Sequence, residues 1–239
     1  MDEYFIDLEP IKKMDIHIIT GHLGSGKTEI AVNLALRLAA ERQQDAFSSS
    51  VAVVDIDVIN PYFAAREARN LLESRGIQIA APSIRTTTAA LPVLSKEVYQ
   101  MLHREDLTLV IDVGGDPAGA RILGSLRDHL QNRHLHVYCV VNTKRPFTSV
   151  SHGILEYLTG ISTASHLAFT GLIHNTHLLH ETSAADICAG QRLLEQVARE
   201  IGVPVVLTAV MQSLAYDLEG CIANDMLLME QYIKPPYLL

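Results

Sequence analysis

The stretch that decides the fold is Gly21-His22-Leu23-Gly24-Ser25-Gly26-Lys27-Thr28, near the start of the chain. It matches G-x-x-x-x-G-K-[ST], the pattern of a phosphate-binding loop, at every specified position. Residues 15–20 (DIHIIT) predict a short buried strand before it, and residues 29–38 (EIAVNLALRL) predict an amphipathic helix that opens directly after it. A glycine loop between a strand and a helix turns backbone N–H groups and the positive end of the helix toward an anion.

The expected roles within this loop follow from the chemistry of its side chains. We expect Lys27, on an exposed loop, to reach the β- and γ-phosphates, and the hydroxyl of Thr28 to bind Mg²⁺. A glycine-rich turn that binds nothing is the alternative, and the presence of strand, loop and helix together disfavours it. The residues expected to contact the nucleotide here are Gly21, His22, Gly24, Ser25, Gly26, Lys27 and Thr28.

Composition is typical of a soluble intracellular protein with one domain over residues 1–239. The chain is 48% hydrophobic and 19% charged, which is enough to bury a substantial core. No apolar run approaches the roughly 18 residues that a membrane span needs, and the acidic start MDEYFID is unlike a secretion signal. We therefore expect a cytoplasmic location without membrane binding. The net charge of −8 argues against a general grip on nucleic acid.

The cysteines and the arginines that follow strands give weaker indications. Cys139, Cys188 and Cys221 are far apart in sequence and include no C-x-x-C pair, so we expect neither a disulfide framework nor a zinc or iron–sulfur site. Arg85 and Arg145 each follow a predicted strand and are candidate contacts to phosphate or to a partner.

Apolar strands alternate with helical stretches along the whole chain. We expect strands at 15–20, 51–56, 77–81, 107–112, 135–141, 169–174 and 203–210, and helices at 29–38, 63–74, 96–103, 117–131, 183–202 and 214–233. Strands that are apolar throughout predict a parallel sheet covered on both faces. The predicted fold class is therefore α/β, a three-layer α/β/α domain with a mostly parallel sheet of about seven strands, as in P-loop NTPases.

Three carboxylates follow strands of this sheet at the edge where ligands bind. Asp55 and Asp57 close the second strand, and Asp112 closes the fourth, just before a pair of glycines. We expect Asp55 and Asp112 to hold Mg²⁺, Asp57 to hold the attacking water, and the N–H of Gly115 to approach the γ-phosphate in a switch loop over 114–120. The alternative is that these acids only begin turns or helices.

The phosphate loop, VVDIDVINPYFAARE (53–67) and LVIDVGGDPAGAR (109–121) together resemble the MinD/ParA/CobQ-like P-loop ATPases. These belong to the SIMIBI class, which also contains the signal-recognition GTPases and dethiobiotin synthetase. The resemblance implies a seven-stranded, mostly parallel sheet, ATP with Mg²⁺, and an ATP-dependent homodimer. It also implies that Asp57 positions the water and that the switches run over 57–63 and from Asp112. His22 departs from the family pattern, because relatives with a deviant loop carry Lys there.

Two asparagines resemble the family's contacts to the nucleotide base. Asn142 ends the fifth strand and Asn175 ends the sixth, and the resemblance implies that Asn175 hydrogen-bonds adenine. From the residues alone, either asparagine is a turn residue after a strand. The guanine motif N-K-x-D is absent from the chain, since Asn142-Thr143-Lys144 is followed by Arg145.

The leading hypothesis is a slow, Mg²⁺-dependent ATPase that switches an unidentified protein partner. The alternative is an ATP-dependent synthetase of the dethiobiotin-synthetase or CobQ type, which phosphorylates a small-molecule carboxylate. A metal-insertion GTPase is disfavoured by the missing guanine motif.

Overall fold

The computed structural model describes residues 16–42, 50–57, 68–81, 94–130, 133–218 and 220–233. The described strands are β1 (Ile16–Gly21), β2 (Ser50–Asp55), β3 (Gln78–Ala80), β4 (Leu107–Asp112), β5 (Leu135–Val141), β6 (Gly171–His174), β7 (Val205–Met211) and β8 (Asp225–Met229). The α-helices are α2 (Lys27–Arg42), α3 (Arg69–Ser74), α4 (Lys96–Leu102), α5 (Pro117–Ser125), α6 (Arg127–Leu130), α7 (Ser151–Ser165) and α8 (Ala184–Ile201), with 3₁₀ turns η2 (Pro146–Thr148) and η3 (Gln212–Leu218).

The strands form one eight-stranded sheet in the order β3-β2-β4-β1-β5-β6-β7-β8, and every described pair is parallel. The register aligns the acidic strand ends, because Asp55 pairs with Asp112 and Asp112 also pairs with Ile19 of β1. The phosphate loop therefore leaves the middle of the sheet beside the two carboxylates that close β2 and β4. Sequence reasoning predicted that the acids closing β2 and β4 lie at one edge of the sheet, beside the end of β1, and the strand register confirms this prediction.

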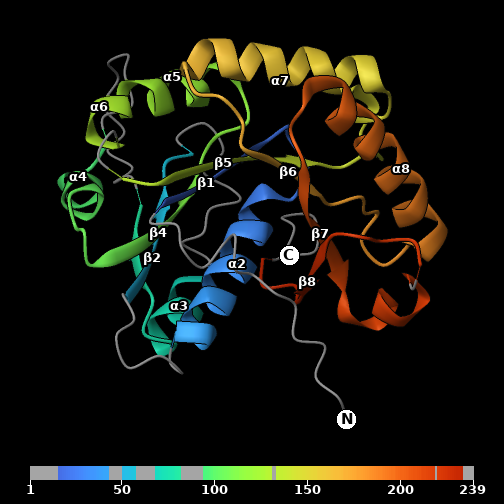
Figure 1. Ribbon diagram of the computed structural model, residues 1–239. Helices are drawn as coiled ribbons and strands as arrows, with labels where there is room; N and C mark the ends of the chain where they lie inside the picture. Colours follow the sequence, from blue (N-terminus) through green and yellow to red (C-terminus); the bar gives the residue numbers. More distant parts are fainter. Residues whose placement is uncertain are drawn as a thin grey trace.

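Helices cover both faces of the sheet, which gives the predicted three layers (Figure 1). On one face α2, α3 and β8 bury one cluster, centred on Ile30, Leu34 and Leu72. On the other face α4, α5 and α6 bury a second cluster, and α7 packs with α8 over a third. The strands read as continuous apolar runs because each described central strand is covered on both sides.

The C-terminal region is where the prediction of the fold is wrong. We expected a helix over 214–233, but this region forms the short turn η3 and then the eighth strand, β8. The sequence DMLLM is rich in good helix formers. Pairing with β7 outweighs that propensity, because it turns Leu227 and Met229 into the core while Leu228 stays exposed.

Three helices also differ from the prediction. Helix α7 was missed: its N-cap, Val150, makes no side-chain hydrogen bond, so the usual capping signal is absent there. The helix expected over 117–131 is broken at Leu126 into α5 and α6. By contrast Ser95 caps α4, by accepting a hydrogen bond from the N–H of Val98. The helix expected over 63–74 is described from Arg69 on, and residues 63–67 lie outside the described part.

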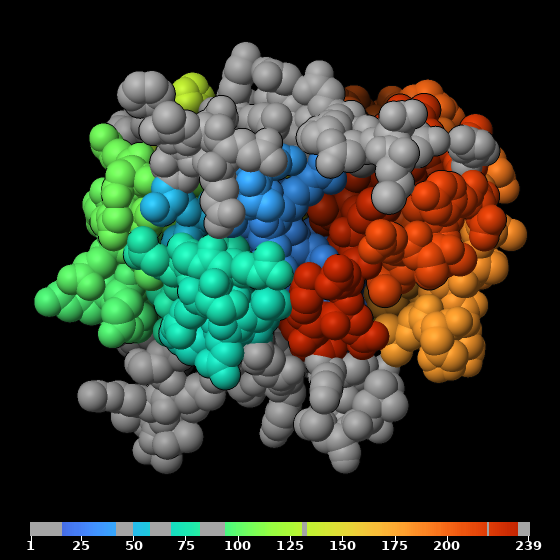
Figure 2. Space-filling model, turned by 90° about the horizontal axis from the view of Figure 1, so that it is seen from below, coloured from blue at the N-terminus to red at the C-terminus, as the bar shows by residue number. Residues whose placement is uncertain are grey.

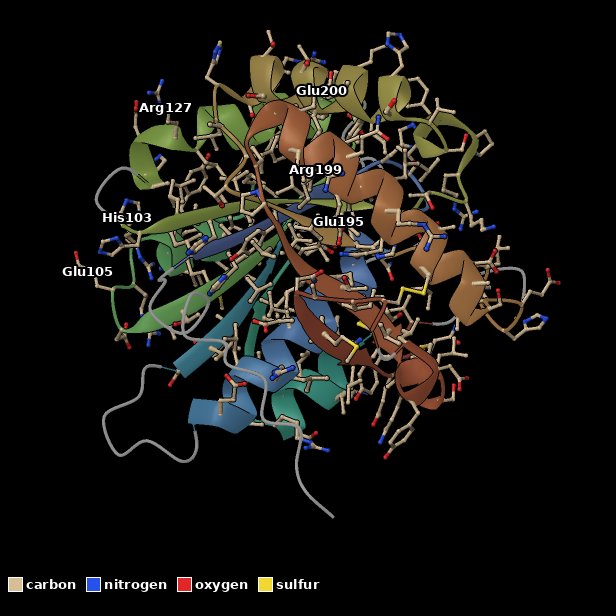
Figure 3. The ribbon with its side chains drawn as sticks, turned by 45° about the vertical axis from the view of Figure 1, so that its right-hand side comes forward. His103, Glu105, Arg127, Glu195, Arg199 and Glu200 are labelled. Carbon is tan, nitrogen blue, oxygen red and sulfur yellow. A yellow bond between two sulfur atoms is a disulfide. The ribbon has the colours of Figure 1, made fainter. Side chains whose placement is uncertain are left out.

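A disulfide joins Cys188 and Cys221, so the expectation of no disulfide framework is wrong for these two cysteines. Their Cα atoms are 5.7 Å apart although 33 positions separate them in sequence. After β7 the chain turns through η3 and passes the start of α8, which brings the two residues together (Figure 3). In the described residues, no helix is both long and apolar enough to cross a membrane.

Candidate nucleotide-binding site

The phosphate loop has the bent backbone that its glycines predict. Gly24 and Gly26 have φ angles of 78° and 85°, which side chains disfavour. The loop closes on itself through the N–H of Ser25, which donates to the carbonyl of His22 at 2.9 Å. Arg145, just after β5, donates from Nε to the carbonyl of Gly24 at 2.8 Å. The arginine suggested as a phosphate contact thus hydrogen-bonds the loop backbone, and it also lines the cavity beside the loop.

Lys27 is buried rather than exposed, contrary to the expectation from sequence. Its Nζ lies 3.1 Å from Oδ2 of Asp57, and the two side chains are 8% and 3% exposed. Burial alone would lower the pKa of Lys27, but the negative charges of Asp112, Asp57 and Asp55 outweigh burial and raise the pKa above its ordinary value. The lysine expected to contact phosphate therefore forms an ion pair with the carboxylate expected to orient water.

Asp55 and Asp112 form a buried acidic pair beside this lysine, and both are fully buried. Asp55 accepts a hydrogen bond from the N–H of Asp57 at 2.9 Å, which fixes the turn after β2. Burial raises the pKa of Asp112 to about 7, an effect that the charge of Lys27 opposes, and Thr28 lies close enough to lower the pKa as well. A hydroxyl with two carboxylates is an all-oxygen donor set, which fits Mg²⁺. A bound cation would also favour the charged form of Asp112.

Gly115 lies directly over the first glycine of the loop. A Cβ built on Gly115 would collide with the carbonyl oxygen of Gly21, and a Cβ on Gly114 would lie 3.1 Å from Oδ1 of Asp57. The hydroxyl of Tyr157, on α7, donates to the carbonyl of Gly115 at 3.0 Å. The segment after β4 therefore contacts both the phosphate loop and Asp57, and only glycines allow this approach.

His22 packs into an aromatic cluster. Its ring stacks on Phe147 at 5.2 Å between centroids and meets Tyr157 edge-on at 5.5 Å. Its Nδ1 lies 3.2 Å from the carbonyl oxygen of Leu23. His22 thus joins the phosphate loop to η2 and α7.

The two asparagines contact the phosphate loop and its neighbours. The amide nitrogen of Asn142 donates to the carbonyl of His177 at 3.0 Å, and its oxygen accepts from the N–H groups of Lys144 and His177. Asn175 donates to the carbonyl of Ser25 at 2.7 Å, from below the loop. The contacts of Asn142 support the turn, whereas Asn175 also lines a cavity. Base recognition by either residue stays a prediction.

A cavity of about 750 Å³ opens beside the phosphate loop. This volume lies within the range of known ligand pockets. The cavity is lined by Gly26, Lys27 and Thr28 of the phosphate loop and also by the apolar side chains of Ile187, Val210 and Leu214. Burial lowers the pKa of His177, another lining residue, to about 4, with a further contribution from the charge of Arg145, so His177 is neutral at pH 7. The lining of the cavity thus combines phosphate-loop residues with apolar side chains.

Sequence reasoning missed several residues that shape this site. Phe147 and Tyr157 support the loop and Gly115, and Glu29 and Asn33 bind the segment after β8. Of these, Glu29 has a visible signal, since it directly follows Thr28, yet its partners lie about 200 positions away. Other expected elements, the rest of the first switch (58–63), Arg85 and the loop around it, lie outside the described residues.

No family model matches the chain, and no curated protein matches it. Solved structures do match it. FtsY from Thermotoga maritima has a TM-score of 0.56 at 16% identity, over 86% of this chain and 66% of that one. Chloroplast FtsY from Physcomitrella patens has a TM-score of 0.53 at 20% identity, over 82% and 58%. The signal recognition particle receptor FtsY from Elizabethkingia anophelis, in complex with GDP, has a TM-score of 0.52 at 17% identity, over 83% and 57%.

These likenesses show the fold alone. The chain spans between 57% and 66% of the length of these three solved structures. The three-layer α/β/α fold expected from sequence is confirmed, and the FtsY structures share it. The finer resemblance to MinD and ParA stays a prediction.

Proposed function

We propose that this protein binds a nucleoside triphosphate with Mg²⁺, hydrolyses it slowly, and acts as a nucleotide-dependent switch for a protein partner. One observation carries the proposal: a buried lysine and three buried carboxylates converge beside a glycine loop with phosphate-binding geometry. A structural ion-pair cluster would not need the two glycine positions with positive φ or an adjoining cavity. The similarity in fold to a signal recognition particle receptor favours a switch over a synthetase.

The position of each site residue supports a different role in nucleotide binding and hydrolysis. Lys27 exchanges Asp57 for the phosphates, which frees this carboxylate to orient the attacking water. Thr28, Asp55 and Asp112 would hold the metal. When bound, Mg²⁺ supplies positive charge against the phosphate oxygens. The backbone of Gly115, held by Tyr157, is placed to sense whether a γ-phosphate is present.

We further propose that the nucleotide is ATP. Guanine recognition needs a carboxylate that accepts from the ring N–H and the exocyclic amine. The position after Lys144 holds Arg145, a donor engaged with the loop. Asn175 lines the cavity, and an amide has both an acceptor and a donor for the adenine edge. ATP and ADP should therefore bind several-fold more tightly than GTP and GDP.

An exposed apolar rim surrounds the phosphate loop and supports the switch proposal. Leu23, Phe147 and Val150 are 66%, 42% and 57% exposed, although all three are apolar. Leu23 belongs to the loop itself, and Phe147 stacks on His22. A surface at this place would change with the nucleotide, as a partner site or as the contact of an ATP-dependent homodimer.

Competition of ATP, ADP, GTP and GDP against one fluorescent nucleotide analogue tests binding and base preference together. Lys27→Ala should abolish binding or hydrolysis, whereas Lys96→Ala, an exposed lysine on α4, should change neither. Asn175→Ala should erode the adenine preference. Hydrolysis by Lys27→Ala at the wild-type rate would refute the proposed site, and equal or tighter GTP binding would refute the choice of ATP.

A further inference from the structure

Helix α2 holds a distant piece of the chain through a carboxylate. Glu29 lies in the first turn of α2, directly after Thr28. One of its oxygens accepts the N–H of Tyr232 at 2.6 Å, and the other accepts the N–H of Ile233 at 3.1 Å. Two adjacent backbone donors on one carboxylate make a bidentate, charge-assisted contact, which is stronger than a neutral pair.

Asn33, one turn further along α2, completes the contact. Its oxygen accepts the N–H of Glu230 at 3.0 Å, and its nitrogen donates to the carbonyl of the same residue at 2.9 Å. Together Glu29 and Asn33, here called the α2 clamp, hydrogen-bond three of the four residues 230–233. The α2 clamp thus hydrogen-bonds the backbone of this segment, as a neighbouring strand does within a sheet. In Figure 2 the red C-terminal atoms border the blue atoms of α2.

The clamped segment is a wall of the cavity. Met229, Glu230, Gln231 and Ile233 line it, and Ile233 is almost fully buried in the core cluster of α2. Lys27 and Thr28 line the same cavity. Helix α2 therefore carries Lys27 and Thr28 in its first turn and, with the next side chain, holds another part of the cavity lining.

We propose that Glu29 is a positioning residue for nucleotide recognition: it fixes residues 230–233 as the wall against which the base and ribose pack, at a set distance from the phosphate loop. The inference rests on the proposed nucleotide binding and deepens it. Loss of the carboxylate releases two backbone N–H groups, and the wall moves away from the cavity. The phosphate loop itself keeps its geometry, because its hydrogen bonds from Ser25 and Arg145 do not involve Glu29.

The negative charge of Glu29 has a second effect, on the binding of anions. Glu29 places a negative charge next to the phosphate loop, so its removal should favour a bare polyphosphate anion. A nucleotide also needs the wall. Glu29→Ala should therefore weaken nucleotide binding while inorganic tripolyphosphate binds as well as before or more tightly. A residue that only stabilised the fold would weaken both ligands.

The experiment measures the dissociation constants of ATP and of inorganic tripolyphosphate, both with Mg²⁺, for the full chain and its variants. For Glu29→Ala we expect about a tenfold loss for ATP, because two charge-assisted hydrogen bonds are lost, and no loss for tripolyphosphate. Glu29→Gln keeps one acceptor and should recover part of the loss. Glu41→Ala, which removes a carboxylate from the other end of α2, should leave both constants unchanged.

Each outcome decides between the interpretations. Equal losses for ATP and tripolyphosphate, or no change in ATP binding by Glu29→Ala, would overturn the role of Glu29. If Glu29→Ala does not fold, Glu29→Gln and Asn33→Ala carry the same comparison, with smaller expected losses confined to ATP. A wild-type protein that binds tripolyphosphate but no nucleotide would refute the nucleobase wall, whereas one that binds neither would refute the proposed function itself.

Discussion

Replacing Asp57 by Asn should make the protein bind ATP more tightly while stopping its hydrolysis. In the structure Asp57 holds Lys27 at 3.1 Å, with both side chains almost fully buried. A triphosphate must take Lys27 away from this carboxylate before the lysine can contact phosphate oxygens. In the wild-type protein, separation of the Lys27–Asp57 ion pair therefore reduces the free energy of ATP binding. The neutral amide of Asn removes most of this loss.

The size of the effect follows from the coupling between close, buried charges. Measured couplings for such pairs begin at about 1.5 kcal/mol. We use the lower end, about 1.5 to 2 kcal/mol, because Asp112 and Asp55 still attract Lys27 after the substitution. A difference of that size corresponds to about a tenfold to 30-fold lower dissociation constant. Turnover should fall by at least about 100-fold, as expected when the residue that orients the water is lost.

Equilibrium binding of a fluorescent ATP analogue, with single-turnover hydrolysis on the same samples, measures both effects. Glu41→Gln is the matched control, because Glu41 forms a pair with Arg37 at 3.0 Å on α2, away from the loop. This control should change neither quantity. Weaker or unchanged binding by Asp57→Asn would show that the Lys27–Asp57 pair does not compete with the triphosphate. Wild-type turnover would remove Asp57 from the reaction.

Three further predictions concern stability and the approach of the loops. Burial raises the folded-state pKa of Asp112 from 3.8 to about 7, so its contribution to stability is fully present below the unfolded pKa and is lost as the pH rises through 7. Melting curves of the nucleotide-free protein should show this loss of stability. The variant Asp112→Asn should abolish this pH dependence. Gly115→Ala should reduce turnover at least tenfold, because its Cβ meets the phosphate-loop backbone. Gly160→Ala, in open space on α7, should raise the free energy of unfolding by about 1 kcal/mol. Equal effects of the two variants in activity and melting assays would contradict this prediction. Reduction of the Cys188–Cys221 disulfide should lower the free energy of unfolding in urea by at most about 4 kcal/mol, as a loop of that length predicts, and an unchanged midpoint would argue against a stabilising role.

The phosphate loop shows how much of the site could be predicted locally. Its eight residues carry the bend, the lysine and the hydroxyl in one continuous stretch, so a pattern of residue types was sufficient. The acids after β2 and β4 were also placed correctly, because the parallel register of a sheet brings strand ends to one edge. The burial of Lys27 could not be predicted, since it depends on Asp57 and Asp112 closing over the side chain.

The errors lie where distant segments decide the structure. Residues 225–229 have a local preference for helix, yet the free edge of β7 makes them a strand. The Cys188–Cys221 disulfide depends on the same turn of the chain, which spacing alone does not reveal.

Sequence by itself determined the fold class, the order of most strands and helices, and the residues that form the phosphate loop, because these depend on periodicity and on one contiguous motif. Tertiary structure decided what those residues contact: the pairing of Lys27 with Asp57, the stacking of His22 on Phe147, and the hold of Glu29 on the segment after β8. Glu29 and Tyr232 are 203 positions apart, and only the packing of β8 beside α2 brings them within a hydrogen bond. Contacts of that range depend on how the whole chain packs, and no local pattern of residues encodes them.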